Sequence, residues 1–158
     1  MSALAKELDA AAAMSDESLA EARSALDAKE AEIRDAGRAI RASGKYLSNR
    51  DAWRAYRMAP DRRAFYTAHR RELEACNDAR RTLADLFPDG KAPSINELRE
   101  TKARLECERD TLYEKWCDER HLNREISTAK RNIDAVLGRS RNEKAMQLRK
   151  DRDGIELE

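Results

Sequence analysis

Large aliphatic residues recur every seven positions in two separate parts of this 158-residue chain. In the earlier part they are Leu19, Leu26, Ile33 and Ile40, and Leu47 continues the series. In the later part they are Leu98, Leu105, Leu112, Ile126 and Ile133, with Glu119 in the remaining position. A seven-residue repeat kept over several heptads is typical of helices that pack along a shared seam. The spacing therefore predicts long helices that pack against each other or against a symmetry-related chain.

The second core position of each heptad differs between the two series. In the earlier series it is Ala or Lys, and Ala12, Ala22 and Ala36 lie close to the seam. Small side chains on this face let a partner helix approach closely. In the later series Leu122, Ala129 and Val136 stand three residues after the first core position, so we expect them to complete the seam.

Composition supports helices that each bury one stripe and argues against a round core. Charged residues make up 40% of the chain and aromatic residues 5%, there are 5 Gly and 3 Pro, and the mean hydropathy is −0.92. Such a mixture is typical of long helices. The predicted fold class is all-α: an elongated antiparallel, coiled-coil-like bundle with three long helices and one short helix at an elbow.

Local signals set the expected helix boundaries. Gly44 is suited to follow the first helix, and Pro60 separates the short second helix from the third. Ser94–Glu97 forms a capping-box sequence that starts the fourth helix, and Gly138 is suited to stop it. The expected helices cover about residues 3–42, 49–58, 61–87 and 95–137.

These helices predict a single elongated domain over residues 1–140. The remaining segment, 141–158, has sparse apolar residues and dense charge. It is expected to form a charged, partly disordered tail, with a frayed helix to about Lys150.

Charge is unevenly distributed although the net charge is only +1. Residues 1–37 carry a net charge of −5, residues 38–82 of +7 and residues 83–158 of −1. The basic segment suits phosphate contact, but it equally suits an acidic surface of the same chain or of a protein partner. The candidate contact residues for DNA or a partner are Arg50, Arg54, Arg57, Arg62, Arg63, Arg70 and Arg71.

Aromatic residues gather in the stretch "NRDAWRAYRMAP" and just after it. Trp53 and Tyr56 lie on one helical face, and Phe65 follows the break at Pro60. Aromatic rings beside arginines suit stacking with nucleic acid. They also suit a structural elbow in which the rings pack together where helices meet, with Trp53, Tyr56, Pro60 and Phe65 as its residues.

Three cysteines, Cys76, Cys107 and Cys117, form no C-x-x-C pair. The Ala-rich N-terminal stretch carries charges, unlike a signal peptide, and no apolar run approaches the length of a membrane span. The expectation is a cytoplasmic chain with reduced thiols and no membrane partner.

No catalytic residue, metal ligand set or cofactor site is predicted. His69 and His121 lack partners at the spacing of a closed metal site, and Cys117 with His121 would supply two ligands only. The glycines are isolated, so no phosphate-binding loop is present. The chain is therefore expected not to be an enzyme.

Spaced patterns over roughly residues 40–140 resemble the C-terminal helical region of mobilisation relaxases, the DNA-nicking proteins of plasmids and conjugative elements. The patterns occur in the order R-D-x-x-x-A-Y-R at Arg50–Arg57, H-R-x-E-L at His69–Leu73, the turn and helix start at Ala92–Leu98, L-Y-x-x-W at Leu112–Trp116 and I-D-x-x-L-G at Ile133–Gly138.

The resemblance implies an accessory region without the catalytic nuclease domain, because the family's metal-binding histidine cluster has no counterpart here. It implies a non-catalytic interaction module that serves protein docking or dimerisation in conjugative DNA transfer, through the heptad seams. The alternative is a DNA-binding accessory module that uses the basic segment 38–82.

Overall fold

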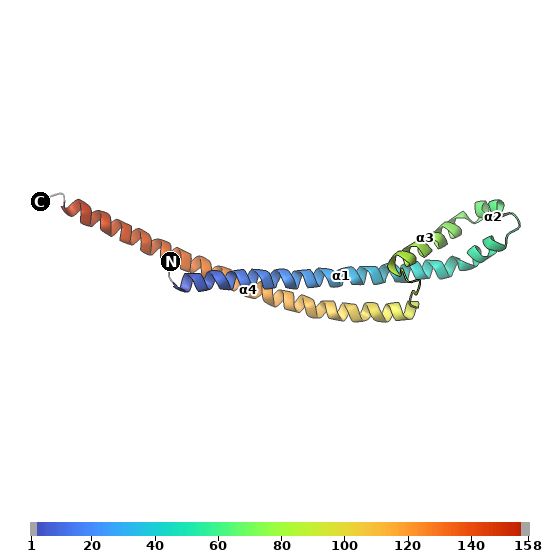
Figure 1. Ribbon diagram of the computed structural model, residues 1–158, viewed down its shortest axis with the longest axis horizontal. Helices are drawn as coiled ribbons and strands as arrows, with labels where there is room; N and C mark the ends of the chain where they lie inside the picture. The colour runs from blue at the N-terminus through green and yellow to red at the C-terminus, as the bar shows by residue number, and fades with distance from the viewer. Residues whose placement is uncertain (1–2, 156–158) are drawn as a thin grey trace. The chain divides into compact units, whose positions relative to one another are not determined.

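The computed structural model describes residues 3–155, which form four α-helices and no other regular element (Figure 1). They are α1 (Ala3–Met58), α2 (Arg62–Ala68), α3 (Arg70–Leu86) and α4 (Ile95–Ile155). The all-α class is confirmed, and four helices were expected. Only α1 and α4 are long, however, and most boundaries differ from those expected.

The expected break at Gly44 is wrong, because α1 continues through it to Met58. Asn49 does not cap a new helix; its side-chain amide donates to the Lys45 carbonyl one turn earlier, at 2.8 Å. A glycine inside a helix costs about 1 kcal/mol relative to alanine. Ala42 and Ser43, just before Gly44, are 5% and 8% exposed, so this part of α1 is packed against its neighbours.

The expected third helix is interrupted at His69, which separates α2 from α3. Asp61 caps α2 by accepting a hydrogen bond from the Ala64 N–H at 3.0 Å, so Pro60 lies before the cap and not in the first turn. At His69 the backbone leaves helical geometry, with φ −119° and ψ 27°. The end of α3 at Leu86, with Phe87 as its cap, agrees with the expected end near residue 87.

The capping box at the start of α4 is confirmed. The Glu97 N–H donates to the Ser94 hydroxyl at 3.3 Å, and the Ser94 N–H donates to the Glu97 carboxylate at 2.7 Å. The hydrogen bond from the Ser94 N–H, together with the Ser94 hydroxyl, lowers the pKa of the Glu97 carboxyl. In the preceding turn, Gly90 has a φ of 73°, which favours glycine.

The expected stop at Gly138 is wrong, because α4 continues to Ile155. No atom lies within 4 Å of where a Cβ would stand at Gly138, and the residue continues the helix without acting as its cap. The helix thus continues past the expected end near Lys150, the partly disordered tail over 141–158 stays a prediction, and residues 156–158 lie outside the described part of the chain.

Contacts group the chain into two compact units. The first contains the part of α1 up to Ala25 and the part of α4 from Leu112 onward. These two segments run antiparallel: Asp9 meets Lys130, Asp16 meets Asn123, and Arg23 meets Trp116. The single domain over 1–140 stays a prediction.

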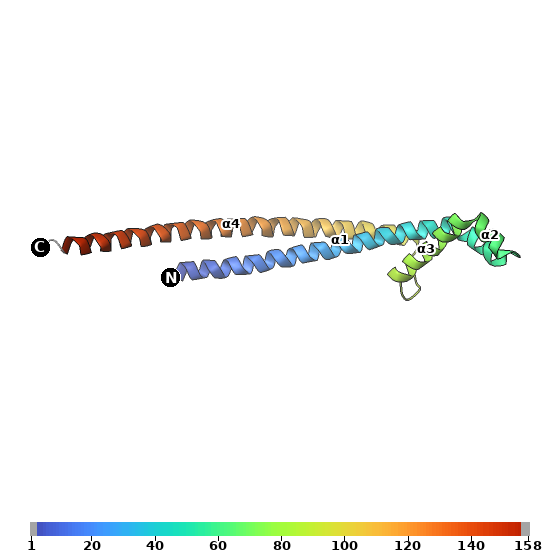
Figure 2. The same cartoon turned by 90° about the horizontal axis from the view of Figure 1, so that it is seen from above.

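The second unit, Leu26–Thr111, contains the rest of α1, α2, α3 and the start of α4. Two views show α3 alongside the last part of α1 (Figure 1, Figure 2). Most of the buried apolar residues lie here: Leu26, Ala36, Ala39, Ala42, Leu73, Cys76, Ala79, Leu98 and Leu105. The small residues of α1 and α3 let the two helices approach closely, and burial raises the pKa of the Cys76 thiol.

Candidate interaction surfaces

Five rings lie together in the second unit where α1 ends and α2 begins; we call them the elbow cluster. Tyr56 is central, with ring centroids 5.8 Å from Trp53, 6.4 Å from Phe65 and 6.3 Å from Tyr66. Phe65 also packs against His69 at 4.3 Å. Tyr66 and His69 were not among the four residues that the sequence proposed for the elbow. The interruption at His69 brings its ring back over Phe65, one turn earlier.

Two basic side chains extend the elbow cluster onto α3. The Arg80 guanidinium lies 5.0 Å from the centre of the Trp53 ring, a cation–π distance. Arg70 binds the Glu74 carboxylate at 2.7 Å, and the Tyr66 hydroxyl donates to the same carboxylate at 3.2 Å. Arg70 and this hydroxyl lower the pKa of the Glu74 carboxyl.

The seven arginines that the sequence proposes as contact residues do not form one surface pattern. Arg50 and Arg54 both lie near the Asp51 carboxylate, at 3.9 and 3.7 Å. Arg62 donates to the Arg57 carbonyl at 3.2 Å, and Arg70 is bound to Glu74 as described above. Among the described residues, the side chains of Arg57, Arg63 and Arg71 are exposed and make no ion pair.

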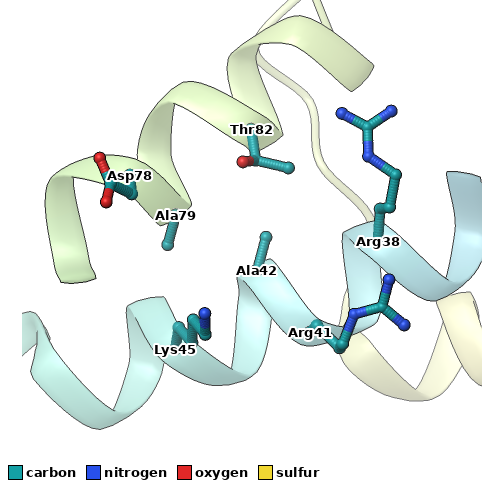
Figure 3. A pocket seen from close by; sticks show the side chains of 7 residues that line it. All are labelled: Arg38, Arg41, Ala42, Lys45, Asp78, Ala79 and Thr82. Carbon is teal, nitrogen blue, oxygen red and sulfur yellow. The ribbon is translucent and has the colours of Figure 1, made fainter.

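A separate group of basic residues lines a groove between α1 and α3, which we call the basic groove (Figure 3). Arg38, Arg41 and Lys45 line its α1 side, at one-turn spacing on a single helical face. Asp78 and Thr82 line the α3 side. The groove has a volume of about 210 Å³.

The floor of the basic groove is apolar. Ala42 and Ala79 point toward each other between the helices, and both are buried (Figure 3). Arg38 is held by Asp35 at 3.1 Å, whereas Arg41 and Lys45 make no ion pair with any described residue. The spacing of 38, 41 and 45 was visible in the sequence, but their position opposite α3 was not.

In the first unit, the expected second core position of α4 is wrong. Leu122 is 48% exposed, Val136 is 62% exposed, and Ala129 is exposed too. We call these three residues the α4 stripe. They lie on one face of the helix, seven residues apart, and all three are exposed in the first unit.

Three other residues of α4, Trp116, Asn123 and Lys130, contact α1 instead. Each stands four residues after a first core position of the heptad series. Asn123 donates to the Ser15 hydroxyl at 3.3 Å and to the Asp16 carboxylate at 2.7 Å. Lys130 binds Asp9 at 2.6 Å, which raises the pKa of Lys130.

The Trp116 ring completes this polar seam. Arg23 and Arg120 lie 5.5 and 5.2 Å from its centre. The small α1 residues opposite, such as Ala22, leave room for a tryptophan and for long polar side chains. These interactions explain why polar residues of α4, and not the residues of the α4 stripe, contact α1.

Another hollow lies under the turn between α3 and α4. It has a volume of about 420 Å³ and a mostly apolar lining that includes Tyr46, Leu47, Leu83 and Ile95. Leu47, which continues the heptad series of α1, is 46% exposed and lines this hollow.

The histidines and cysteines do not assemble into a cluster. His69 lies 3.3 Å from Glu72 and His121 lies 3.4 Å from Glu125, each within one turn of the same helix. No three His, Cys, Asp or Glu side chains in the described part of the chain lie close enough to hold a metal ion. Among the described helices, none has an apolar stretch that could cross a lipid bilayer.

Comparisons with protein-family models, with curated proteins and with solved structures find no match to the chain. The resemblance to mobilisation relaxases therefore stays a prediction from the patterns quoted above.

Proposed function

We propose that the chain is a non-catalytic helical interaction module, serving as an accessory region of a mobilisation relaxase, and that the α4 stripe docks a helix of a protein partner. The observation that carries this proposal is the exposure of Leu122, Ala129 and Val136 at heptad spacing on one face of α4. A helix lies along such a row with its own apolar face.

The polar seam of the first unit supports the same conclusion. Its described residues include only Ser15 and Ala22 among the buried ones, whereas nine buried apolar residues lie in the second unit. A helical pair that buries so little apolar surface gains stability when a third helix covers the α4 stripe.

Substitution of the α4 stripe tests the proposal. Leu122→Glu with Val136→Glu places two charges where a partner helix would pack, and both residues are already exposed in the isolated chain. We expect transfer of the mobile element that encodes the chain to fall at least tenfold, a loss of about 1.4 kcal/mol of docking free energy. The helicity and melting temperature of the purified protein should be unchanged.

Arg124→Ala is the matched control, because it changes an exposed residue between the two stripe positions. Transfer by this variant should stay within twofold of the wild type. If the Leu122→Glu, Val136→Glu variant also transfers like the wild type, the α4 stripe is not the docking surface.

DNA binding through the basic segment 38–82 is a second candidate. It is favoured by Arg57, Arg63 and Arg71, which are exposed and make no ion pair among the described residues. Fluorescence anisotropy with a single-stranded oligonucleotide tests it at about 50 mM salt, where phosphate contacts are strong. Binding that is lost in the Arg50→Ala, Arg54→Ala, Arg57→Ala variant, with helicity retained, would establish this function.

A further inference from the structure

We propose that the basic groove binds an acidic face of α1 from a second copy of this chain. This interaction uses other residues than the α4 stripe and does not depend on the proposed function. Arg38, Arg41 and Lys45 form the basic wall, and only Arg38 has an ion-pair partner among the described residues.

The complementary face lies in the first unit, on the side of α1 turned away from α4. Met14, Glu17 and Glu21 follow one another at one-turn spacing, and all three are exposed. Met14 is 72% exposed, and neither glutamate has an ion-pair partner in the described chain. We call these three residues the acidic face.

The two surfaces match in charge, and the residues of each recur at about one helical turn. Glu17 and Glu21 are separated by four positions, and Arg38 and Arg41 by three. In an antiparallel pairing, Glu21 meets Arg38 and Glu17 meets Arg41. Met14 then lies over the aliphatic part of Lys45, a contact that keeps the ammonium group in water.

The acidic face must come from another molecule. It belongs to the same helix as the basic wall, and a helix that is continuous from Ala3 to Met58 does not fold back on itself. A second copy supplies the same face without this restriction.

Phosphate is a poorer occupant than a protein helix. Asp78 lines the groove and would repel a nucleic-acid backbone, whereas a peptide helix can place a neutral side chain beside it. The floor of Ala42 and Ala79 also suits an apolar side chain better than an anion.

Charge reversal on each side tests the pairing. One variant carries Glu17→Arg and Glu21→Arg, and the other carries Arg38→Glu and Arg41→Glu. Sedimentation equilibrium at about 50 mM salt should show self-association of the wild type that weakens at least tenfold in each variant. An equimolar mixture of the two variants should regain it, because each then offers the charge that the other requires.

Two further measurements test whether the association depends on charge and whether it is independent of the α4 stripe. Association of the wild type should weaken when salt is raised to about 500 mM, where exposed charges are screened. The Leu122→Glu, Val136→Glu variant should associate like the wild type, so that failure of the α4 stripe proposal is distinguishable from failure of this one.

Three results would overturn the inference. The first is a wild-type chain that stays monomeric. The second is association that neither reversal weakens or that the mixture does not regain. The third is single-stranded DNA binding that the Arg38→Glu, Arg41→Glu variant loses while the wild type shows no self-association, which would assign the basic groove to nucleic acid.

Discussion

At the scale of single residues, Trp53 makes two ring contacts in the second unit, one within α1 and one with α3. Its ring packs against Tyr56 within α1 and under the Arg80 guanidinium from α3. The side chain is half-buried, so these contacts and not a fully enclosed core determine its contribution.

Trp53→Ala should therefore lower the free energy of unfolding by about 1–2 kcal/mol, the combined size of an aromatic pair and a cation–π contact. Urea denaturation followed by circular dichroism measures this change. Met58→Ala is the control, because Met58 is 86% exposed and should be neutral. Equal stability of the two variants would show that the elbow cluster does not stabilise the second unit.

Carboxylates with lowered pKa values make stability depend on pH. Arg70 lowers the pKa of Glu74, the capping box lowers that of Glu97, and Lys29, 3.0 Å away, lowers that of Glu108. Because the folded state holds these groups ionised below their ordinary pKa of 4.5, their contribution is fully present above that value. It is lost as the pH falls through the lowered values.

The melting temperature should accordingly be constant from about pH 7 to about pH 5 and fall at lower pH. Glu97→Gln should show a smaller fall, because the amide can still accept the Ser94 hydrogen bond but does not titrate. Thermal melts at a series of pH values measure this dependence. A melting temperature that is unchanged down to about pH 3 would contradict the assignment of these carboxylates.

At the scale of elements, α1 shows how packing overrides a local stop signal. Gly44 has no positive φ and no atom within 4 Å of where a Cβ would stand, so alanine fits there without strain. Gly90 also has open space but a φ of 73°. Gly90 therefore has a backbone conformation that favours glycine, whereas Gly44 has one that any residue can adopt.

Gly44→Ala should stabilise the chain by about 1 kcal/mol, because alanine is the better helix former. Gly90→Ala should destabilise it by about the same amount, because a side chain at positive φ is strained. Chemical denaturation compares both with the wild type. Destabilisation by Gly44→Ala would mean that α1 ends near residue 44 after all.

The sequence predicted the face of α1 that packs, because aliphatic residues at heptad spacing have few alternatives to burial. Leu26 and Ala22, which are 1% and 5% exposed, lie on it as expected. The seam of α4 could not be predicted in the same way. Leu122 is more apolar than Asn123, but Asn123 has partners at Ser15 and Asp16, more than a hundred residues away.

For the candidate sites too, contacts between residues near in sequence could be predicted, whereas contacts between residues far apart in sequence could not. Trp53, Tyr56 and Phe65 were named together because they are near in sequence, and their rings lie together. The basic groove was not foreseen, because it requires α3 to lie opposite residues 38–45 of α1. Helical spacing identifies the residues that share a face, whereas only the packing shows what that face meets.

At the scale of the whole molecule, apolar burial and polar pairing are divided between the two units. The second unit holds most of the buried apolar residues, together with the elbow cluster and the basic groove. The first unit has a polar seam and exposes the α4 stripe. This division leads us to place docking in the first unit.

Photo-crosslinking in cells that express the chain tests this placement most directly. A benzophenone amino acid would replace Leu122 in one variant and Arg124, also exposed on α4, in another. We predict a crosslinked species from position 122 and none from position 124, because only residue 122 lies on the α4 stripe. No crosslink from position 122, or equal crosslinking from both positions, would contradict the account.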